Sequence, residues 1–184
     1  HQKNSNIFYL NNMDTKALYE LYKKHPVITT DSRNCPKGSI FIALKGASFN
    51  GNAFAEKALE EGCAYAIIDE AQCKKDDRYI VVDDCLQTFK NIAREHRRQF
   101  DIPVIGITGS YGKTSVKYFL NQLLSVKYDV YMTPGNYNTT LGVIRAVREG
   151  LRPTHQIFLC EMGARHVGDI AEICVLAQPD MGII

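Results

Sequence analysis

Gly106-Ile107-Thr108-Gly109-Ser110-Tyr111-Gly112-Lys113-Thr114-Ser115 is the stretch that decides the fold of this chain. It follows the apolar run 103–105, which predicts a buried strand, and it precedes a run with the apolar spacing of a helix. Glycines let backbone N–H groups close around phosphate oxygens, and a helix N-terminus adds partial positive charge. The stretch therefore predicts a phosphate-binding loop between a strand and a helix.

Two side chains of this loop carry the expected chemistry. Lys113 would reach the β- and γ-phosphates, and the Thr114 hydroxyl would bind Mg²⁺. The strict spacing needs a glycine at position 107, where this chain has Ile107. The alternative is a glycine-rich turn with a solvated lysine and threonine, but the flanking strand and helix favour nucleotide binding. The helix is expected to bury one face, made of Val116, Phe119, Leu120, Leu123 and Leu124.

Composition excludes several classes of protein. The 184 residues are 45% hydrophobic, enough for one or two cores, and a net charge of +2 does not indicate nucleic acid or an anionic membrane as a partner. No apolar stretch of membrane-spanning length and no secretory signal is present, which favours the cytoplasm. Six cysteines with irregular spacing predict reduced thiols rather than a zinc site, although the even number leaves disulfides open.

The pattern changes near residue 102, where we place a domain boundary. Residues 1–102 predict a small mixed α/β domain. Beyond it, expected strands at 103–107, 129–132, 157–160 and 181–184 alternate with expected helices at 114–126, 140–149 and 169–177. This alternation predicts a parallel, doubly wound α/β sheet built on the phosphate loop. Because the chain ends inside an expected strand, we expect a truncated domain and a fragment of a longer protein.

Polar residues follow two of the expected strands. Ile157–Cys160 is a continuous apolar run that delivers Glu161 to the carboxyl end of a strand, where a carboxylate can hold Mg²⁺. An ordinary exposed glutamate is the alternative. Asn136 and Asn138 lie in the polar loop 133–140, which is either part of a ligand site or only a turn with a threonine helix cap.

In the first domain, Asp31-Ser32-Arg33 follows a short β-rich run. The hydroxyl and guanidinium groups are suited to a phosphate-bearing ligand, and the alternative is an Asp–Arg surface pair.

Several ordered segments resemble the Mur ligase family. Thr30–Arg33, Gly38–Gly46 and Phe49–Phe54 resemble its N-terminal domain, and Thr108–Thr114 resembles its ATP loop. The resemblance implies that the first domain binds a UDP-N-acetylmuramoyl substrate. The residues that it implies for this role are Thr30, Asp31, Ser32, Arg33, Lys45, Gly46, Asn50, Gly51 and Asn52.

The same resemblance implies roles in the second domain. Lys113 and Glu161 are implied as catalytic residues, and Thr114 and Glu161 as metal ligands. The implied ATP-binding residues are Thr108, Gly109, Ser110, Tyr111, Gly112, Lys113, Thr114, Ser115, Asn136 and Asn138. Gly135–Asn138, Gly142-Val143 and Glu161–Ala164 are most similar to the family members that add D-alanyl-D-alanine.

The implied activity is an ATP- and Mg²⁺-dependent amide ligase of peptidoglycan precursor synthesis. It would add D-alanyl-D-alanine to a UDP-N-acetylmuramoyl tripeptide through an acyl phosphate, and we expect a cytoplasmic monomer without nucleic-acid or membrane partners. The fragment alone is expected to be inactive. One alternative is another Mur-type ligase or a folylpolyglutamate synthase, and another is a non-catalytic module that binds UDP-sugars or nucleotides.

Overall fold

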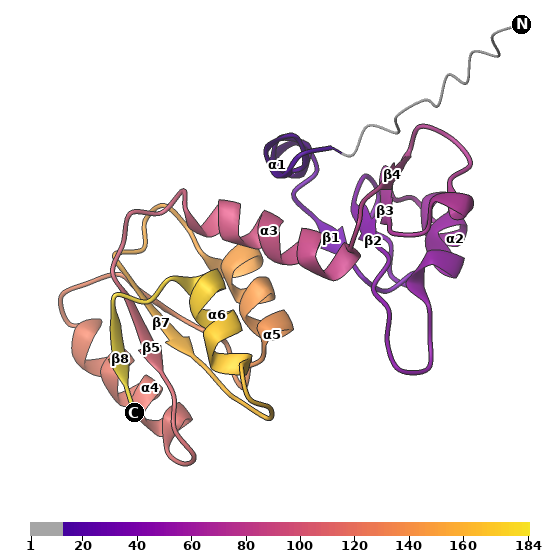
Figure 1. Cartoon of the computed structure of the whole chain (residues 1–184). Coiled ribbons are helices and arrows are strands. Elements are labelled where there is room, and N and C mark those ends of the chain that lie inside the picture. Colours follow the sequence, from indigo (N-terminus) through magenta and orange to yellow (C-terminus); the bar gives the residue numbers. More distant parts are fainter. Residues whose placement is uncertain (1–12) are drawn as a thin grey trace, which may run out of the picture. The chain divides into compact units, whose positions relative to one another are not determined.

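The computed structural model describes residues 13–184 and divides the chain into two compact units, His1–Phe89 and Lys90–Ile184 (Figure 1). Residues 1–12 of the predicted first domain lie outside the described part. The division falls within helix α3 (Cys85–Arg97), earlier than the predicted boundary at 102.

The C-terminal half of α3 belongs to the second unit because of two polar anchors. Lys90 pairs with Glu172, and the Arg97 guanidinium donates to the Ala177 carbonyl oxygen at 3.0 Å. These contacts attach the helix to the second unit, so that this unit begins at Lys90, ahead of its first strand.

The first unit contains a parallel sheet with the order β1-β2-β3-β4. Its elements are α1 (Thr15–Lys24), β1 (Ile28–Thr29), β2 (Ile40–Ile42), the 3-10 helix η1 (Gly51–Phe54), α2 (Ala55–Glu60), β3 (Tyr65–Ile68), the 3-10 helix η2 (Ala71–Cys73) and β4 (Tyr79–Val81). Asp14 caps α1 by accepting from the Ala17 N–H at 2.7 Å. β2 is buried along its whole length, as its apolar run requires.

The second unit contains a parallel sheet with the order β6-β7-β5-β8. Its elements after α3 are β5 (Val104–Ile107), α4 (Lys113–Leu124), β6 (Val130–Met132), α5 (Thr140–Arg145), the π-helical segment η3 (Ala146–Gly150), β7 (Ile157–Glu161), α6 (Asp169–Ala177) and β8 (Met181–Ile183). α4 lies on one side of this sheet, and α5 and α6 lie together on the other (Figure 1). This confirms the predicted doubly wound α/β fold.

The predicted inner face of α4 is partly wrong. Val116, Leu120 and Leu124 do pack on the core of the second sheet, but Phe119 is 67% exposed and Leu123 is 72% exposed. The helix is rotated relative to the apolar pattern because Lys117 occupies an inward position and is fully buried. Polar partners at the carboxyl edge of the sheet, in the loop after β6 and at the end of β7, hold the lysine there.

Two smaller expectations also have outcomes. The expected helix 140–149 is α5 followed by η3, so its regular part is shorter than the pattern indicated. All six cysteines lie within the described residues and are free thiols, as predicted. None of the helices described for residues 13–184 combines the length and the hydropathy that a membrane span requires.

Candidate nucleotide site and the polar edge of the first sheet

The parallel strands of the second unit bring the predicted loop residues together. The phosphate loop follows β5, the polar loop 133–140 follows β6, and Glu161 ends β7 opposite Ile107 of β5. Because all strands run in one direction, these segments meet at the carboxyl edge of the sheet, which is where open α/β sheets bind ligands.

The phosphate loop has the backbone that its glycines permit. Gly109 has φ +122° and Gly112 has φ +76°, values that other residues rarely adopt. Gly112 is the residue before the first turn of α4, and Lys113 and Thr114 open that helix. Lys113 Nζ donates to the Gly109 carbonyl oxygen at 2.7 Å, so its ammonium group lies over the loop. The loop therefore presents one cation and a helix N-terminus at the same place.

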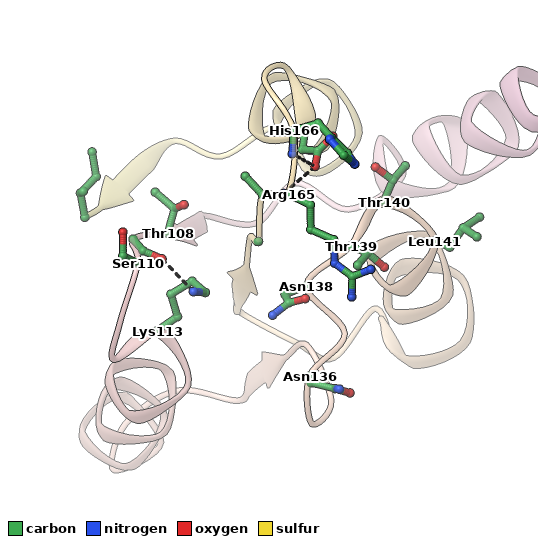
Figure 2. Close-up of a pocket in the computed structure, with 15 residues that line it drawn as sticks. Thr108, Ser110, Lys113, Asn136, Asn138, Thr139, Thr140, Leu141, Arg165 and His166 are labelled. Carbon is green, nitrogen blue, oxygen red and sulfur yellow. Dashed lines mark hydrogen bonds between the residues drawn. The ribbon is translucent and has the colours of Figure 1, made fainter.

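A cleft of about 950 Å³ opens beside this loop. Figure 2 shows Ser110 and Lys113 on one side of the cleft and Asn138, Thr139 and Thr140 on the other. The complete lining is Thr108, Gly109, Ser110, Lys113, Asn136, Asn138, Thr139, Thr140, Leu141, Gly163, Ala164, Arg165, His166, Asp169 and Ile184. The volume suits a small ligand of nucleotide size.

Glu161 is buried and does not line the cleft. Its side chain is 1% exposed, and its carboxylate accepts from Thr114 Oγ1 at 3.1 Å and from Asn138 Nδ2 at 3.1 Å. Asn138 is held in place by Gly163, whose N–H donates to the Asn138 carbonyl oxygen at 2.7 Å. A Cβ at position 163 would lie 3.0 Å from the Asn138 side chain, which explains the glycine there. The exposed-glutamate alternative is therefore wrong.

Sequence reasoning missed Lys117, which pairs with this carboxylate. Lys117 Nζ lies 2.8 Å from Glu161 Oε2, with both side chains buried. Burial by itself raises the pKa of Glu161, but hydrogen bonds from Lys117 and Asn138 and the lysine charge lower it further, so that the net pKa is below its ordinary value. One signal was available: Lys117 follows Thr114 by three residues, which places both on one helix face.

The oxygen donors at this point fit the implied metal. The Thr114 hydroxyl touches the Glu161 carboxylate, and Mg²⁺ prefers oxygen ligands, usually one or two carboxylates with phosphate oxygens and water. Among residues 13–184, no group of three or more His, Cys, Asp or Glu side chains is arranged to hold a metal ion.

Other predicted nucleotide residues lie outside the cleft lining. Tyr111 is 95% exposed, and Gly112, Thr114 and Ser115 are also absent from the lining. Conversely, Arg165 and His166 line the cleft although no pattern pointed to them. In Figure 2 the Arg165 side chain extends toward Asn138 and Thr139. Nucleotide binding by Tyr111, Gly112, Thr114 and Ser115 stays a prediction.

The first predicted substrate segment, Thr30–Arg33, follows β1. Asp31 and Arg33 form a surface pair, with Arg33 Nε and Nη2 each 2.9 Å from a carboxylate oxygen and the Arg33 side chain 81% exposed. The side-chain hydrogen bond from Arg33 lowers the pKa of Asp31 to about 2. Thr30 is exposed and Ser32 is half-buried. This geometry matches the surface-pair alternative and leaves a role in binding as a prediction.

The second predicted substrate segment follows β2 and contains Lys45, Asn50 and Asn52. Lys45 Nζ lies 2.9 Å from Asp69 and 3.2 Å from Glu70, at the end of β3. Asn50 donates to Glu70 at 2.8 Å, and Asn52 donates to Asp69 at 2.8 Å. The two predicted segments thus lie at the carboxyl ends of adjacent parallel strands, at one edge of the first sheet.

The two glycines of this segment have different surroundings. A Cβ at Gly51 would lie 2.5 Å from the Leu44 carbonyl oxygen, so a side chain does not fit against that backbone. Gly46 is exposed but lies under the Phe49 ring. The close approach at Gly51 fixes the start of η1 below the polar edge.

Two family models match the chain in succession. The description "Mur ligase family, catalytic domain" matches residues 26–108, and "Mur ligase middle domain" matches residues 107–184.

Known proteins agree with both matches. The UDP-N-acetylmuramoyl-tripeptide--D-alanyl-D-alanine ligase of Synechocystis sp. is 37% identical over 85% of this chain and 35% of its own length. The UDP-N-acetylmuramoyl-L-alanyl-D-glutamate--2,6-diaminopimelate ligase of Lawsonia intracellularis is 36% identical over 73% of this chain and 28% of its own length. The crystal structure of MurF ligase from Thermotoga maritima in complex with ADP superposes with a TM-score of 0.76 at 35% identity, covering 83% of this chain and 35% of that one.

The chain thus spans about a third of the length of the relatives that it matches. The two matched ranges contain both parallel sheets, the phosphate loop and Glu161. The chain belongs to the Mur ligase family.

Proposed function

We propose that the full-length protein containing this chain is an ATP-dependent ligase that joins D-alanyl-D-alanine to a UDP-N-acetylmuramoyl tripeptide. The observation that carries this proposal is the assembly of Lys113, Thr114 and Glu161 at one sheet edge, in a chain 37% identical to a ligase named for that reaction. The related MurF structure is a complex with ADP, which supports nucleotide binding by this chain. Mg²⁺ and a cytoplasmic setting belong to the proposal, and a monomer remains our expectation.

The residues of the second unit have defined tasks in this proposal. ATP, when bound with Mg²⁺, supplies the phosphoryl group that converts an unreactive carboxylate into an acyl phosphate. Lys113 and the loop N–H groups would place fixed positive charge where negative charge develops on phosphate oxygens. Thr114 and Glu161 would supply the oxygen ligands for the metal. The polar edge of the first sheet would hold the UDP-N-acetylmuramoyl substrate.

A second candidate is the diaminopimelate-adding reaction. It is favoured by the 36% identity to a relative named for it. Its substrate peptide is one residue shorter and its amine is an amino acid rather than a dipeptide, so the two reactions can be separated with defined substrates.

The test is a substrate-pair assay on the full-length protein, followed by phosphate release and product mass. We expect turnover with the tripeptide substrate and D-alanyl-D-alanine, and none when the amine is omitted. Turnover only with the UDP-N-acetylmuramoyl dipeptide and diaminopimelate would favour the second candidate. Binding of ATP and UDP-substrate without turnover of either pair would favour a non-catalytic module.

A further inference from the structure

Lys117 is a buried cation to which the proposed function gives no task. It lies in α4, is 0% exposed, and shares a helix face with Thr114. Its Nζ donates to the carbonyl oxygens of Thr133 at 2.9 Å and Gly135 at 2.7 Å, and it lies 2.8 Å from Glu161 Oε2. Three acceptors use the three hydrogens of an ammonium group, so the lysine head is fixed in one position.

The backbone of Glu161 is fixed from the same side. Its N–H donates to Thr133 Oγ1 at 3.0 Å, and the Thr133 carbonyl oxygen accepts from Lys117. Lys117 therefore rests on the segment that also anchors the end of β7, and it extends one remaining hydrogen to the carboxylate. Oε2 faces Lys117, Oε1 accepts from Asn138, and Thr114 Oγ1 lies 3.1 Å from both oxygens.

We propose that Lys117 is the positioning residue for Glu161, setting the orientation of the carboxylate that binds a divalent cation together with a nucleotide. This inference rests on the proposed function, because it takes Glu161 to be a metal ligand. Partners that orient a metal ligand typically change metal affinity by about 10- to 100-fold when they are removed. A purely structural buried pair would change stability and leave the metal affinity of the folded protein unchanged.

The experiment measures Mn²⁺ binding in the presence of ADP, by electron paramagnetic resonance of free Mn²⁺, on the full-length protein. Lys117→Met removes the charge and the donors but keeps an unbranched stem. We expect its Mn²⁺ dissociation constant to rise by about 10-fold or more. The matched control is Lys127→Met, since Lys127 is exposed just after α4 and lies over the Tyr128 ring. The control should remain within about twofold of the wild type.

Two outcomes would overturn the inference: a folded Lys117→Met protein with wild-type Mn²⁺ affinity, or an equal loss in the control. If Lys117→Met alone does not fold, Lys117→Met is combined with Glu161→Gln, and ADP affinity without metal is compared with that of Glu161→Gln. If Lys117 acts only through Glu161, the double variant and Glu161→Gln bind ADP with affinities within about twofold of each other. A further loss of about 10-fold in the double variant would refute the inference. If the wild-type protein takes up no Mn²⁺ with ADP, the proposed function fails and the inference with it.

Discussion

Replacing Glu161 with glutamine tests the buried centre of the second unit most directly. The carboxylate accepts from three donors, namely Lys117 Nζ, Thr114 Oγ1 and Asn138 Nδ2. A glutamine side chain has one oxygen and one NH₂ group, so its NH₂ group would face one of these donors and could not accept a hydrogen bond from it. The substitution also leaves the Lys117 ammonium buried at 0% exposure without its counter-charge.

The structure sets the size of the effect. Removing one partner of a buried ion pair costs about 3–5 kcal/mol, because the remaining charge stays desolvated. With a urea m-value of about 2 kcal/mol/M, a loss of about 3 kcal/mol lowers the unfolding midpoint by about 1.5 M.

The assay is urea unfolding of the 184-residue chain, followed by circular dichroism. Glu20→Gln is the control, since Glu20 and Lys23 form an exposed pair in α1 and exposed pairs contribute about 0–1 kcal/mol. Combining Glu161→Leu with Lys117→Met should recover stability relative to Glu161→Gln, because no lone charge remains. A loss below about 1 kcal/mol for Glu161→Gln would refute the reasoning.

Three further predictions concern single residues. Lys113→Ala in the full-length protein should lower kcat by about 10²- to 10³-fold with UDP-substrate affinity unchanged, and near wild-type turnover in the ligase assay would contradict the role of the loop. Arg33→Ala should weaken binding of the UDP-N-acetylmuramoyl peptide in saturation-transfer NMR, while ADP affinity moves by no more than a few tenths of a kcal/mol; equal losses would place Arg33 outside a separate substrate site. Burial first, and then the charges of Arg148 and Arg152, lower the pKa of His96 from 6.5 to about 4, so the unfolded chain binds more protons between these values. The stability that neutral His96 contributes is fully present above pH 6.5 and should fall by up to about 1.4 kcal/mol per pH unit toward pH 4. The urea midpoint should therefore be lower at pH 5 than at pH 7, and His96→Gln should reduce that difference.

The sequence was sufficient to predict those features of the site that depend on the local spacing of residues. The predicted phosphate loop lies between β5 and α4, and Glu161 ends β7 as its apolar run indicated. Both follow from nearest neighbours: glycines that allow positive φ at 109 and 112, and a strand apolar enough to be central. The Asn136 and Asn138 loop was left open between a ligand site and a turn, because its residues suit both.

The inward face of α4 shows where local patterns fail. Apolar spacing placed Phe119 and Leu123 inside, and the structure exposes both. A helix turns toward the best total of apolar and polar contacts, and here Lys117 has three polar partners under the sheet edge. Two of those partners belong to the loop after β6 and one to the end of β7, so no window of sequence contains the set.

The sequence by itself determined a parallel α/β chain of the Mur ligase family with a phosphate loop and a carboxylate at a strand end. These features depend on residues close together in the chain, whose backbone and burial preferences act locally. Tertiary structure alone decided that Glu161 is buried against Lys117 and that Asn138 donates to the same carboxylate. Both contacts depend on which groups the fold brings together, and on the free-energy cost of leaving a charge or a hydrogen-bond donor unpaired once it is buried.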